Sequence, residues 1–503
     1  MKIISKYPII SILFIHLVTT YISTRYRGDF TFDEMFSTHY SLLPLGDALR
    51  YWVIETNPPL HTFLLRGWLT LLENTELCAR LLSIVFSSAS VIALYTFTKK
   101  FLSQKYAALS SFILIFSTSF IQLSTEARTY SLFLFLTILS FYLFYSIFFE
   151  DNKKTWHTHI YILIQTLLLV SHLTAVLIPL IQLGTLLLPS KNRKNNIVRL
   201  CVSHIIPTVI FCIWFIPSAL SKWGSNTNSA WYFKEAKFEK NILEAIIPLF
   251  VENAPAILGL VVSLGIVGLL TYSLTSLHKH TEKKYLFAML FLWALTPTIV
   301  AGLCGIYIAK YVAFSLPAII ILLVYPILQI QNKKIYYAVL AILGSILIPS
   351  AFIYARTPIQ SWDRTVSFIQ THEIDKTKIL IVPFNQELLI KKYYHGKSPV
   401  VGIYPRVDSL PLNERIVRYN WQEIEVTRED FDLYMQGLVS NTDTIFFLQY
   451  SPNIVDAPVP RWFIQHGWNL TRYIEPIYEI EPYVFEFEKV DNQTTPTKET
   501  RDN

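Results

Sequence analysis

Apolar runs close to 20 residues long recur from the start of the chain to about residue 354. A helix of about 20 apolar residues spans the roughly 30 Å hydrocarbon core of a bilayer. There only helices and closed barrels satisfy their own backbone hydrogen bonds. The runs therefore predict a polytopic α-helical membrane protein with about eleven spans. These fall at residues 7–24, 79–98, 106–123, 130–149, 158–173, 174–189, 200–219, 255–277, 285–304, 311–330 and 335–354.

Composition supports the same class. Hydrophobic residues make up 52% of the 503 residues and charged residues only 16%, whereas soluble domains are about a quarter charged. This balance excludes a soluble enzyme, a disordered protein and a nucleic-acid-binding protein.

Charge divides the chain into two parts. Residues 1–354 carry a net charge of +12 and residues 355–503 a net charge of −5. We therefore predict a membrane domain over 1–354, an α/β domain over 355–490 and a flexible polar tail over 491–503. Alternating patterns in the second part predict helices at 362–371, 386–394 and 460–466, and strands at 378–383, 399–403, 444–449, 470–479 and 482–489.

Basic residues orient the predicted spans. Sixteen Lys and Arg residues, against three acidic residues, occupy one alternating set of loops. Cytoplasmic loops are rich in Lys and Arg, so we expect the N-terminus inside and the C-terminal domain outside. Residues 25–78 and 220–254 then become long external loops. The amphipathic stretches Leu45–Ile54 and Leu60–Leu72 of the first loop are expected along the membrane surface.

The first external loop carries the densest polar cluster. Asp33 and Glu34 form a carboxylate pair suited to a general base acting on a hydroxyl, although a solvated loop would also contain such residues. Glu55 and Asn57 precede a Pro-Pro pair, which fixes the backbone and which a simple helix boundary would also explain. We take both as candidate substrate-binding residues.

Two further segments on the same side carry candidates. The short loop from Glu126 through Arg128 to Tyr130 offers a guanidinium fork suited to phosphate; Glu126 and Arg128 pairing with each other is the alternative. Lys310 and Tyr311 precede a late span. Lys310 would neutralise an anionic ligand or anchor the helix at the interface.

Histidine and cysteine residues suggest no metal site. The four cysteines lie in or beside apolar runs, without disulfide or zinc spacing. His61, His172 and His204 are expected to pack or hydrogen-bond rather than bind metal. We predict no cofactor, and metal dependence stays open.

Several motifs occur in a characteristic order. They are Asp33-Glu34 after the first span, Asn57-Pro58-Pro59-Leu60, Ala79-Arg80-Leu81, Glu126-Ala127-Arg128-Thr129-Tyr130 after the third span, and Lys310-Tyr311 before a late Pro-containing span. In this order the chain resembles the bacterial polyprenyl-phosphate-dependent glycosyltransferases of the GT-C superfamily. Relatives in that group include the protein O-mannosyltransferases, the aminoarabinose transferase of lipid A and the RgtA/B/C/D-like sugar transferases. In the tail, Ser361-Trp362-Asp363-Arg364 and Tyr393-Tyr394 resemble the RgtA-like branch.

The resemblance implies a GT-C fold and an inverting transfer from a polyprenyl-phosphate-linked sugar to an acceptor hydroxyl at the outer face. By this resemblance Asp33 is the base, with Glu34 beside it, and Arg128 and Lys310 stabilise the leaving phosphate. Where Lys310 stands, the family usually has Arg. Many members also have His or Lys where Asn57 stands, so Asn57 receives no charge role.

The implied location is the bacterial inner membrane. The acceptor is a cell-envelope lipid A, polysaccharide, glycolipid or protein, and the sequence names neither it nor the sugar. A transporter or flippase of lipid-linked sugars is the first alternative, yet it would place charges at the bilayer midplane. A non-catalytic assembly scaffold is the second alternative.

Overall fold

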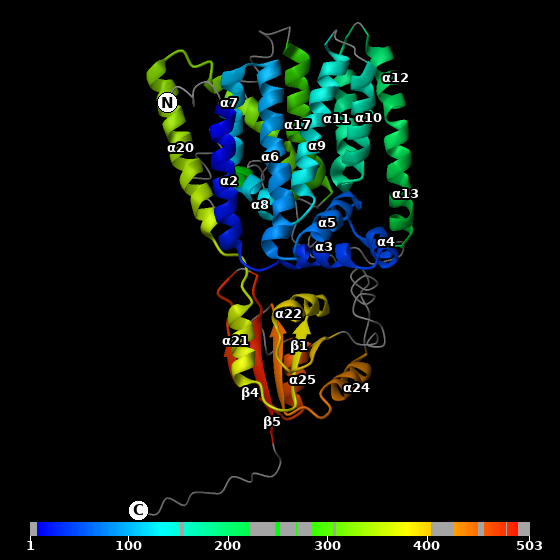
Figure 1. The fold of residues 1–503 in the computed structure, drawn as a ribbon, viewed down its shortest axis with the longest axis vertical. Coiled ribbons are helices and arrows are strands. Elements are labelled where there is room, and N and C mark those ends of the chain that lie inside the picture. The colour runs from blue at the N-terminus through cyan, green and yellow to red at the C-terminus, as the bar shows by residue number, and fades with distance from the viewer. Residues whose placement is uncertain are drawn as a thin grey trace, which may run out of the picture. The chain divides into compact units, whose positions relative to one another are not determined.

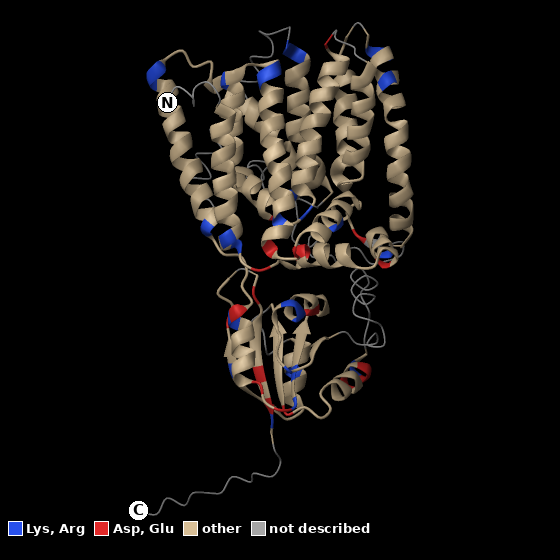
Figure 2. Cartoon of the chain, viewed as in Figure 1, with Lys and Arg blue, Asp and Glu red and all other residues tan. Residues whose placement is uncertain are grey.

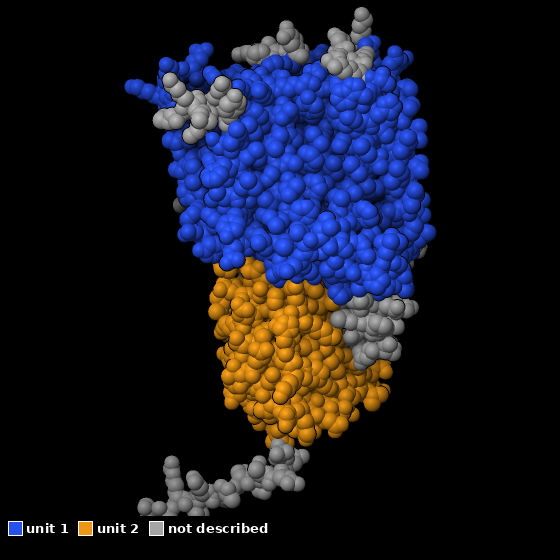
Figure 3. Space-filling model, in the orientation of Figure 1, with its two compact units in different colours: residues 1–27, 37–357 blue, residues 28–36, 358–503 orange. Residues whose placement is uncertain are grey.

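The computed structural model describes residues 8–150, 155–190, 192–221, 247–251, 268, 283–304, 308–403, 427–450, 457–478 and 480–490. The chain forms two compact units (Figure 3). Unit 1 comprises residues 1–27 and 37–357, and unit 2 comprises residues 28–36 and 358–503. The division after residue 357 lies close to the charge boundary at 354. Charge and hydropathy gave no sign that residues 28–36 group with the second unit.

Unit 1 is a bundle of long apolar helices (Figure 1). Seven helices in the described part are long and apolar enough to cross a membrane. They are α2 (Pro8–Arg27), α6 (Glu76–Phe101), α9 (Tyr130–Phe148), α12 with α13 (Arg193–Ser203 and Ile205–Ser221), α17 (Lys284–Leu303), α18 to α19 (Ala309–Val312 and Leu316–Ile327, joined by a 3-10 turn at Ala313–Ser315) and α20 (Lys333–Arg356).

The predicted number of eleven spans is not confirmed. The span expected at 106–123 is a bent pair, α7 (Gln104–Ile115) and α8 (Thr118–Thr125), which meet at 68°. The spans expected at 158–173 and 174–189 correspond to α10 (Thr155–Leu169) and to a 3-10 turn at Leu173–Val176 followed by α11 (Leu177–Leu186). These helices are shorter than the about 20 residues that a span needs. The span expected at 255–277 lies outside the described residues, as does most of the loop expected at 220–254.

Three short helices follow α2 in the first predicted loop. They are α3 (Phe32–Leu42), α4 (Leu45–Ile54) and α5 (Leu60–Leu71). The two amphipathic stretches expected there are helical over almost the predicted bounds. Pro59 stands directly before α5, where its fixed φ suits a helix start. In Figure 1 these helices lie across the ends of the long helices of the bundle.

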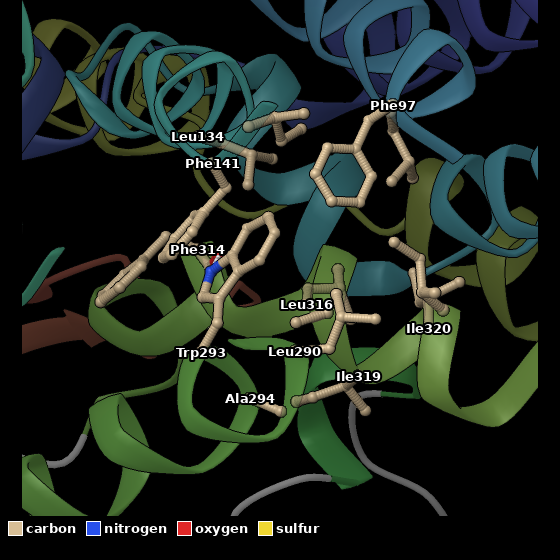
Figure 4. Packing of buried hydrophobic residues seen from close by; sticks show 14 of the residues in the cluster. Phe97, Leu134, Phe141, Leu290, Trp293, Ala294, Phe314, Leu316, Ile319 and Ile320 are labelled. Atoms are coloured by element: carbon tan, nitrogen blue, oxygen red, sulfur yellow. Dashed lines mark hydrogen bonds between the residues drawn. The ribbon is translucent and has the colours of Figure 1, made fainter. Parts of the chain in front are cut away.

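The mainly aliphatic core of unit 1 includes a cluster of aromatic side chains. Trp293 of α17 is fully buried, and its ring stacks on Phe141 of α9 with the centroids 4.1 Å apart (Figure 4). The indole Nε1–H donates to the carbonyl of Phe314 at 2.7 Å, so its polar atom is satisfied within the apolar interior. Phe97 of α6 meets the same indole edge-on at 6.4 Å. One side chain thus joins three helices to the start of α19.

Figure 2 shows Lys and Arg at the end of the bundle where α6 finishes and where α12, α17 and α20 begin. Lys and Arg lie at the opposite end too, together with Asp and Glu. Lys99 and Lys100 close α6, and Lys333 and Lys334 open α20. These described members of the loops that the sequence grouped by charge therefore share one end of unit 1.

Unit 2 contains a five-stranded mixed sheet in the order β2-β1-β3-β5-β4. Strand β1 pairs in parallel with β2 and β3, and β5 pairs antiparallel with β3 and β4. The strands are β1 (Thr377–Val382), β2 (Val400–Gly402), β3 (Thr444–Gln449), β4 (Trp468–Ile474) and β5 (Tyr483–Lys489). The helices are α21 (Asp363–His372), α22 (Glu387–Tyr393, after a 3-10 turn at Phe384–Gln386), α24 (Arg428–Leu438) and α25 (Pro458–Gln465).

Adjacent side chains of β3 point to opposite faces of this sheet. Phe446 contacts Phe368 of α21, whereas Phe447 contacts Phe463 of α25. The predicted small α/β domain is therefore present, with its strands close to the expected bounds. Helix α24 was not predicted, because its segment is mostly polar and only Met435 is buried. The strand expected at 470–479 ends at Ile474.

Candidate functional site

The carboxylate pair of the first predicted loop lies in the first turn of α3. Thr31 stands just before the helix, and its Oγ1 accepts from the Glu34 amide at 3.4 Å. In return the Glu34 carboxylate accepts from the Thr31 amide at 3.0 Å and from the Thr31 hydroxyl at 3.2 Å. This reciprocal arrangement is a capping box, which the Thr-x-x-Glu spacing could have signalled.

The two carboxylates therefore differ in surroundings. Glu34 is fully buried and is occupied in capping α3. Asp33 is half-buried and lies in the first turn of α3. Of the pair, Asp33 is the less buried carboxylate.

Glu126 is the centre of a buried charge cluster in unit 1. Its Oε2 is 3.9 Å from Arg27 Nη2 at the end of α2, and its Oε1 is 3.6 Å from Lys310 Nζ in α18. The side chains of Glu126 and Arg27 are each only 4% exposed. Ser83 of α6 donates to the Glu126 carbonyl at 2.6 Å, which fixes the loop between α8 and α9.

Arg128 lies two residues further along this loop and has a different carboxylate partner. Its Nη2 is 3.8 Å from Glu55 Oε1, and its Nη1 donates to the Ser37 hydroxyl of α3 at 2.8 Å. Its backbone amide donates to the Glu126 carbonyl at 2.7 Å. The Arg128 guanidinium therefore forms its ion pair with Glu55. The sequence had also allowed a pair between Arg128 and Glu126.

Three ion pairs of this cluster are longer than hydrogen bonds. Their nitrogen–oxygen distances are 3.6, 3.8 and 3.9 Å, whereas charge-assisted hydrogen bonds measure about 2.7–2.9 Å. The carboxylates hold the cations near one another. A phosphate oxygen approaching these groups would find cations already gathered, which is the preorganisation that stabilises developing negative charge.

Aromatic rings border the cluster. Lys310 Nζ lies 5.4 Å from the centre of the Tyr130 ring, a cation–π distance. Tyr311 and His172 both contact Tyr130, with ring centres 6.2 and 5.6 Å away. His172 also stacks on Phe133 at 4.9 Å. Tyr130 and Tyr311 therefore shape the apolar side of the site.

His61 adds a neutral neighbour to Arg128. Burial, reinforced by the charge of Arg128, lowers the pKa of His61 to about 3. The imidazole is then uncharged at neutral pH and adds no positive charge to the cluster. The sequence had treated His61 only as a packing residue.

The structure brings together Glu55, Glu126, Arg128, Tyr130, Lys310 and Tyr311 in unit 1. Asn57 is half-buried in the turn before α5. Within the described part of the chain, no three His, Cys, Asp or Glu side chains gather so as to hold a metal ion.

Two residues of the site, Arg27 and Ser37, had no role in the sequence analysis. Neither belongs to one of the motifs. Arg80, part of the Ala-Arg-Leu motif, is fully buried one turn before Ser83 on α6. A fully buried arginine in a membrane helix is costly without partners, and that cost was the available signal.

Comparison with known proteins gives one partial family match and several matches of the fold. Residues 56–220 match the family model described as Dolichyl-phosphate-mannose-protein mannosyltransferase. No curated protein matches the chain by sequence. The fold matches ArnT from Cupriavidus metallidurans in its apo state, with a TM-score of 0.60 at 10% identity, covering 96% of this chain and 98% of that one.

Two further solved structures share the fold. ArnT from Cupriavidus metallidurans bound to undecaprenyl phosphate has a TM-score of 0.56 at 12% identity, covering 95% of this chain and 97% of that chain. The Archaeoglobus fulgidus oligosaccharyltransferase in complex with zinc and sulfate has a TM-score of 0.54 at 12% identity, covering 94% of this chain and 73% of that chain.

The chain therefore has the fold of these solved glycosyltransferase structures. The match to the mannosyltransferase family model covers about a third of the chain. The resemblance to GT-C enzymes drawn from the motif order is confirmed at the level of the fold and of this partial family match.

Proposed function

We propose that the chain transfers a sugar from a polyprenyl-phosphate donor to a hydroxyl group of a cell-envelope acceptor at the outer face of a bacterial inner membrane. The carrying observation is the cluster of Arg27, Arg128 and Lys310 around Glu55 and Glu126, whose side chains are 4–17% exposed. Cations gathered in this way at the end of an apolar bundle suit a lipid phosphate.

The reaction increases the negative charge on that phosphate. The donor is a phosphodiester with one negative charge, and the departing polyprenyl phosphate is a monoester that gains a second. Arg128 and Lys310 stabilise this growing charge, Arg128 through its planar fork and Lys310 as a point charge. Neither has to deliver a proton, because the leaving phosphate is a weak base.

The acceptor supplies the proton that must be removed. Its hydroxyl oxygen attacks the anomeric carbon from the face opposite the phosphate, and the carbon–oxygen bond to the phosphate breaks with its electron pair. The configuration at the anomeric carbon inverts. We assign Asp33 as the base that takes the hydroxyl proton, since Glu34 is occupied by the helix cap. The displacement exchanges one carbon–oxygen bond for another and needs no redox cofactor.

Glu55, Asn57, Glu126, Tyr130 and Tyr311 are proposed to bind the substrates. Glu55 and Glu126 orient the phosphate-binding cations through their ion pairs. Tyr130 and Tyr311 offer ring faces to the sugar or to the first isoprene unit. Asn57 is proposed to hydrogen-bond a sugar hydroxyl.

The proposed orientation in the membrane rests on the end of the bundle that carries Lys99, Lys100, Lys333 and Lys334 (Figure 2). With that end in the cytoplasm, the N-terminus is cytoplasmic and the C-terminal α/β domain is periplasmic. The proposed acceptor is an envelope glycan, lipid or protein, and comparison of envelope glycolipids by mass spectrometry, with and without the gene, would identify it.

The test of the mechanism is turnover by Asp33→Asn. The purified full chain would be supplied with a panel of radiolabelled undecaprenyl-phosphate hexoses and an envelope extract as acceptor. Loss of a general base lowers kcat by about 10²–10⁴-fold. Asp47→Asn is the matched control, because Asp47 lies in the first turn of α4 but is exposed. Near-normal turnover by Asp33→Asn, with normal thermal stability, would remove Asp33 from the role.

A further inference from the structure

Residues 28–36, which carry Asp33, are tied to the C-terminal part of unit 2. The Asp29 amide donates to the Gln360 carbonyl at 3.2 Å, and the Trp362 amide donates to Asp29 Oδ2 at 2.6 Å. Gly28 forms a parallel β-bridge with Gln360. Three contacts therefore join the start of this segment to the residues just before α21.

Gly28 has a conformation that suits only glycine. Its φ is +83°, and a Cβ built at this position would lie 2.0 Å from the Gln360 carbonyl oxygen. A side chain there would be strained and would push the two backbones apart. The close approach of this segment to Gln360 is thus encoded in the sequence.

A second tie comes from α22. The Phe30 amide donates to the Tyr393 hydroxyl at 2.7 Å, and Phe30 itself is fully buried. Lys392 Nζ lies 5.0 Å from the centre of the Phe30 ring. The Tyr393 ring lies almost parallel to that of Trp362, at 9° with centres 6.4 Å apart. These two neighbouring residues therefore contact Phe30 and Asp29, respectively.

We infer that Tyr393 is a positioning residue for the base. Its hydroxyl fixes the Phe30 amide, the next residue caps α3 through Glu34, and Asp33 follows in the first turn of that helix. Contacts from the C-terminal part of unit 2 thereby fix the position of the backbone just before α3, the helix that carries Asp33. This inference rests on the proposed role of Asp33, and it assigns a purpose to the Ser-Trp-Asp-Arg and Tyr-Tyr motifs.

We expect a moderate fall of kcat when the hydrogen bond between Phe30 and Tyr393 is lost. Tyr393→Phe removes the acceptor of one backbone hydrogen bond but keeps the ring beside Trp362. The loss of a single hydrogen bond corresponds to roughly a tenfold change at most. Because small displacements of a reacting group slow catalysis, we expect kcat to fall about fivefold to tenfold and KM for the donor to stay unchanged.

The matched control is the next residue. The Tyr394 hydroxyl accepts from the Ser398 amide at 2.9 Å and hydrogen-bonds Glu373, both away from residues 28–36. Tyr394→Phe removes the same atom from the same domain. It should leave kcat unchanged even though it weakens local packing of the domain.

Two measurements on the purified full chain test the inference. Hydrogen exchange followed by mass spectrometry reads the peptide containing Phe30 without any ligand, and it should exchange faster in Tyr393→Phe than in the wild type or in Tyr394→Phe. Turnover with the radiolabelled undecaprenyl-phosphate hexose panel gives kcat and KM. Unchanged exchange would refute the contact, and faster exchange with wild-type kcat would refute the positioning role. An equal fall of kcat in Tyr394→Phe would also refute it.

A double variant separates this inference from the proposed function. If Tyr393 acts through Asp33, adding Tyr393→Phe to Asp33→Asn should cause no further loss of the residual rate. An additional fall of the same size would show that Tyr393 acts elsewhere. If Asp33→Asn alone were fully active, the role of Asp33 as the base would be refuted. The hydrogen-exchange result would still show whether Tyr393 binds the Phe30 amide.

Discussion

Arg128 offers the sharpest test of phosphate recognition. Its Nη1 donates to Ser37 at 2.8 Å and its Nη2 faces Glu55 at 3.8 Å, so the fork contacts both a hydroxyl group and a carboxylate. Replacing it by lysine keeps the charge and removes the planar fork. The variant Arg128→Gln removes both.

The magnitude follows from the hydrogen bonds lost. A hydrogen bond to a charged group contributes about 1.5–3 kcal/mol, which is roughly 10- to 100-fold in affinity. We therefore expect the Kd for undecaprenyl phosphate to rise about tenfold in Arg128→Lys and about 100-fold in Arg128→Gln. Undecaprenol, which lacks the phosphate, should bind all variants alike.

The assay is equilibrium binding of radiolabelled undecaprenyl phosphate to the purified full chain in detergent. Arg50→Lys is the control, because Arg50 is an exposed arginine of α4. Its affinity for the lipid phosphate should be unchanged. Wild-type affinity in Arg128→Lys, or an equal loss in Arg50→Lys, would show that the Arg128 fork does not recognise the phosphate.

Three further outcomes are expected. Glu34→Gln can still accept from the Thr31 amide and should keep the wild-type thermal midpoint, whereas Glu34→Ala should destabilise the chain by about 1 kcal/mol; equal midpoints would contradict the capping role. A reporter active only in the cytoplasm, fused after Val490, should be silent, and activity there would reverse the proposed orientation. Burial alone would raise the pKa of Glu373, but hydrogen bonds from Tyr394 and Ser398 outweigh it and hold that pKa below its usual value. The stabilisation from these bonds is therefore present above the unfolded-state pKa and is lost as pH falls through the lowered one. The thermal destabilisation by Tyr394→Phe should accordingly be larger at pH 7 than in acid, and a pH-independent difference would contradict this account.

The spanning helices were largely readable from sequence because their cause is local. A bilayer requires each segment to satisfy its own backbone and to be apolar over about 20 residues, and seven described helices meet that requirement. The predicted spans that are not confirmed fall where an apolar run is interrupted. Ser117 separates α7 from α8, and the run across Ser171 and His172 forms two shorter helices.

The candidate site was readable only in part. Residue type and motif order singled out Asp33, Glu126, Arg128 and Lys310, because charges are costly beside a membrane unless they have a use. The sequence did not distinguish the capping role of Glu34 from a catalytic one, although the Thr-x-x-Glu spacing carried that signal.

The sequence by itself therefore determined the membrane class, the polar second domain and the residues worth examining. Tertiary structure decided which charges pair. Glu126 faces Arg27 and Lys310, and Arg128 faces Glu55; these partners lie far apart in the chain and no periodicity relates them. Tertiary structure also decided that residues 28–36 join the C-terminal domain. Local patterns report hydropathy and backbone preference, whereas contacts between distant segments depend on how whole helices and sheets pack.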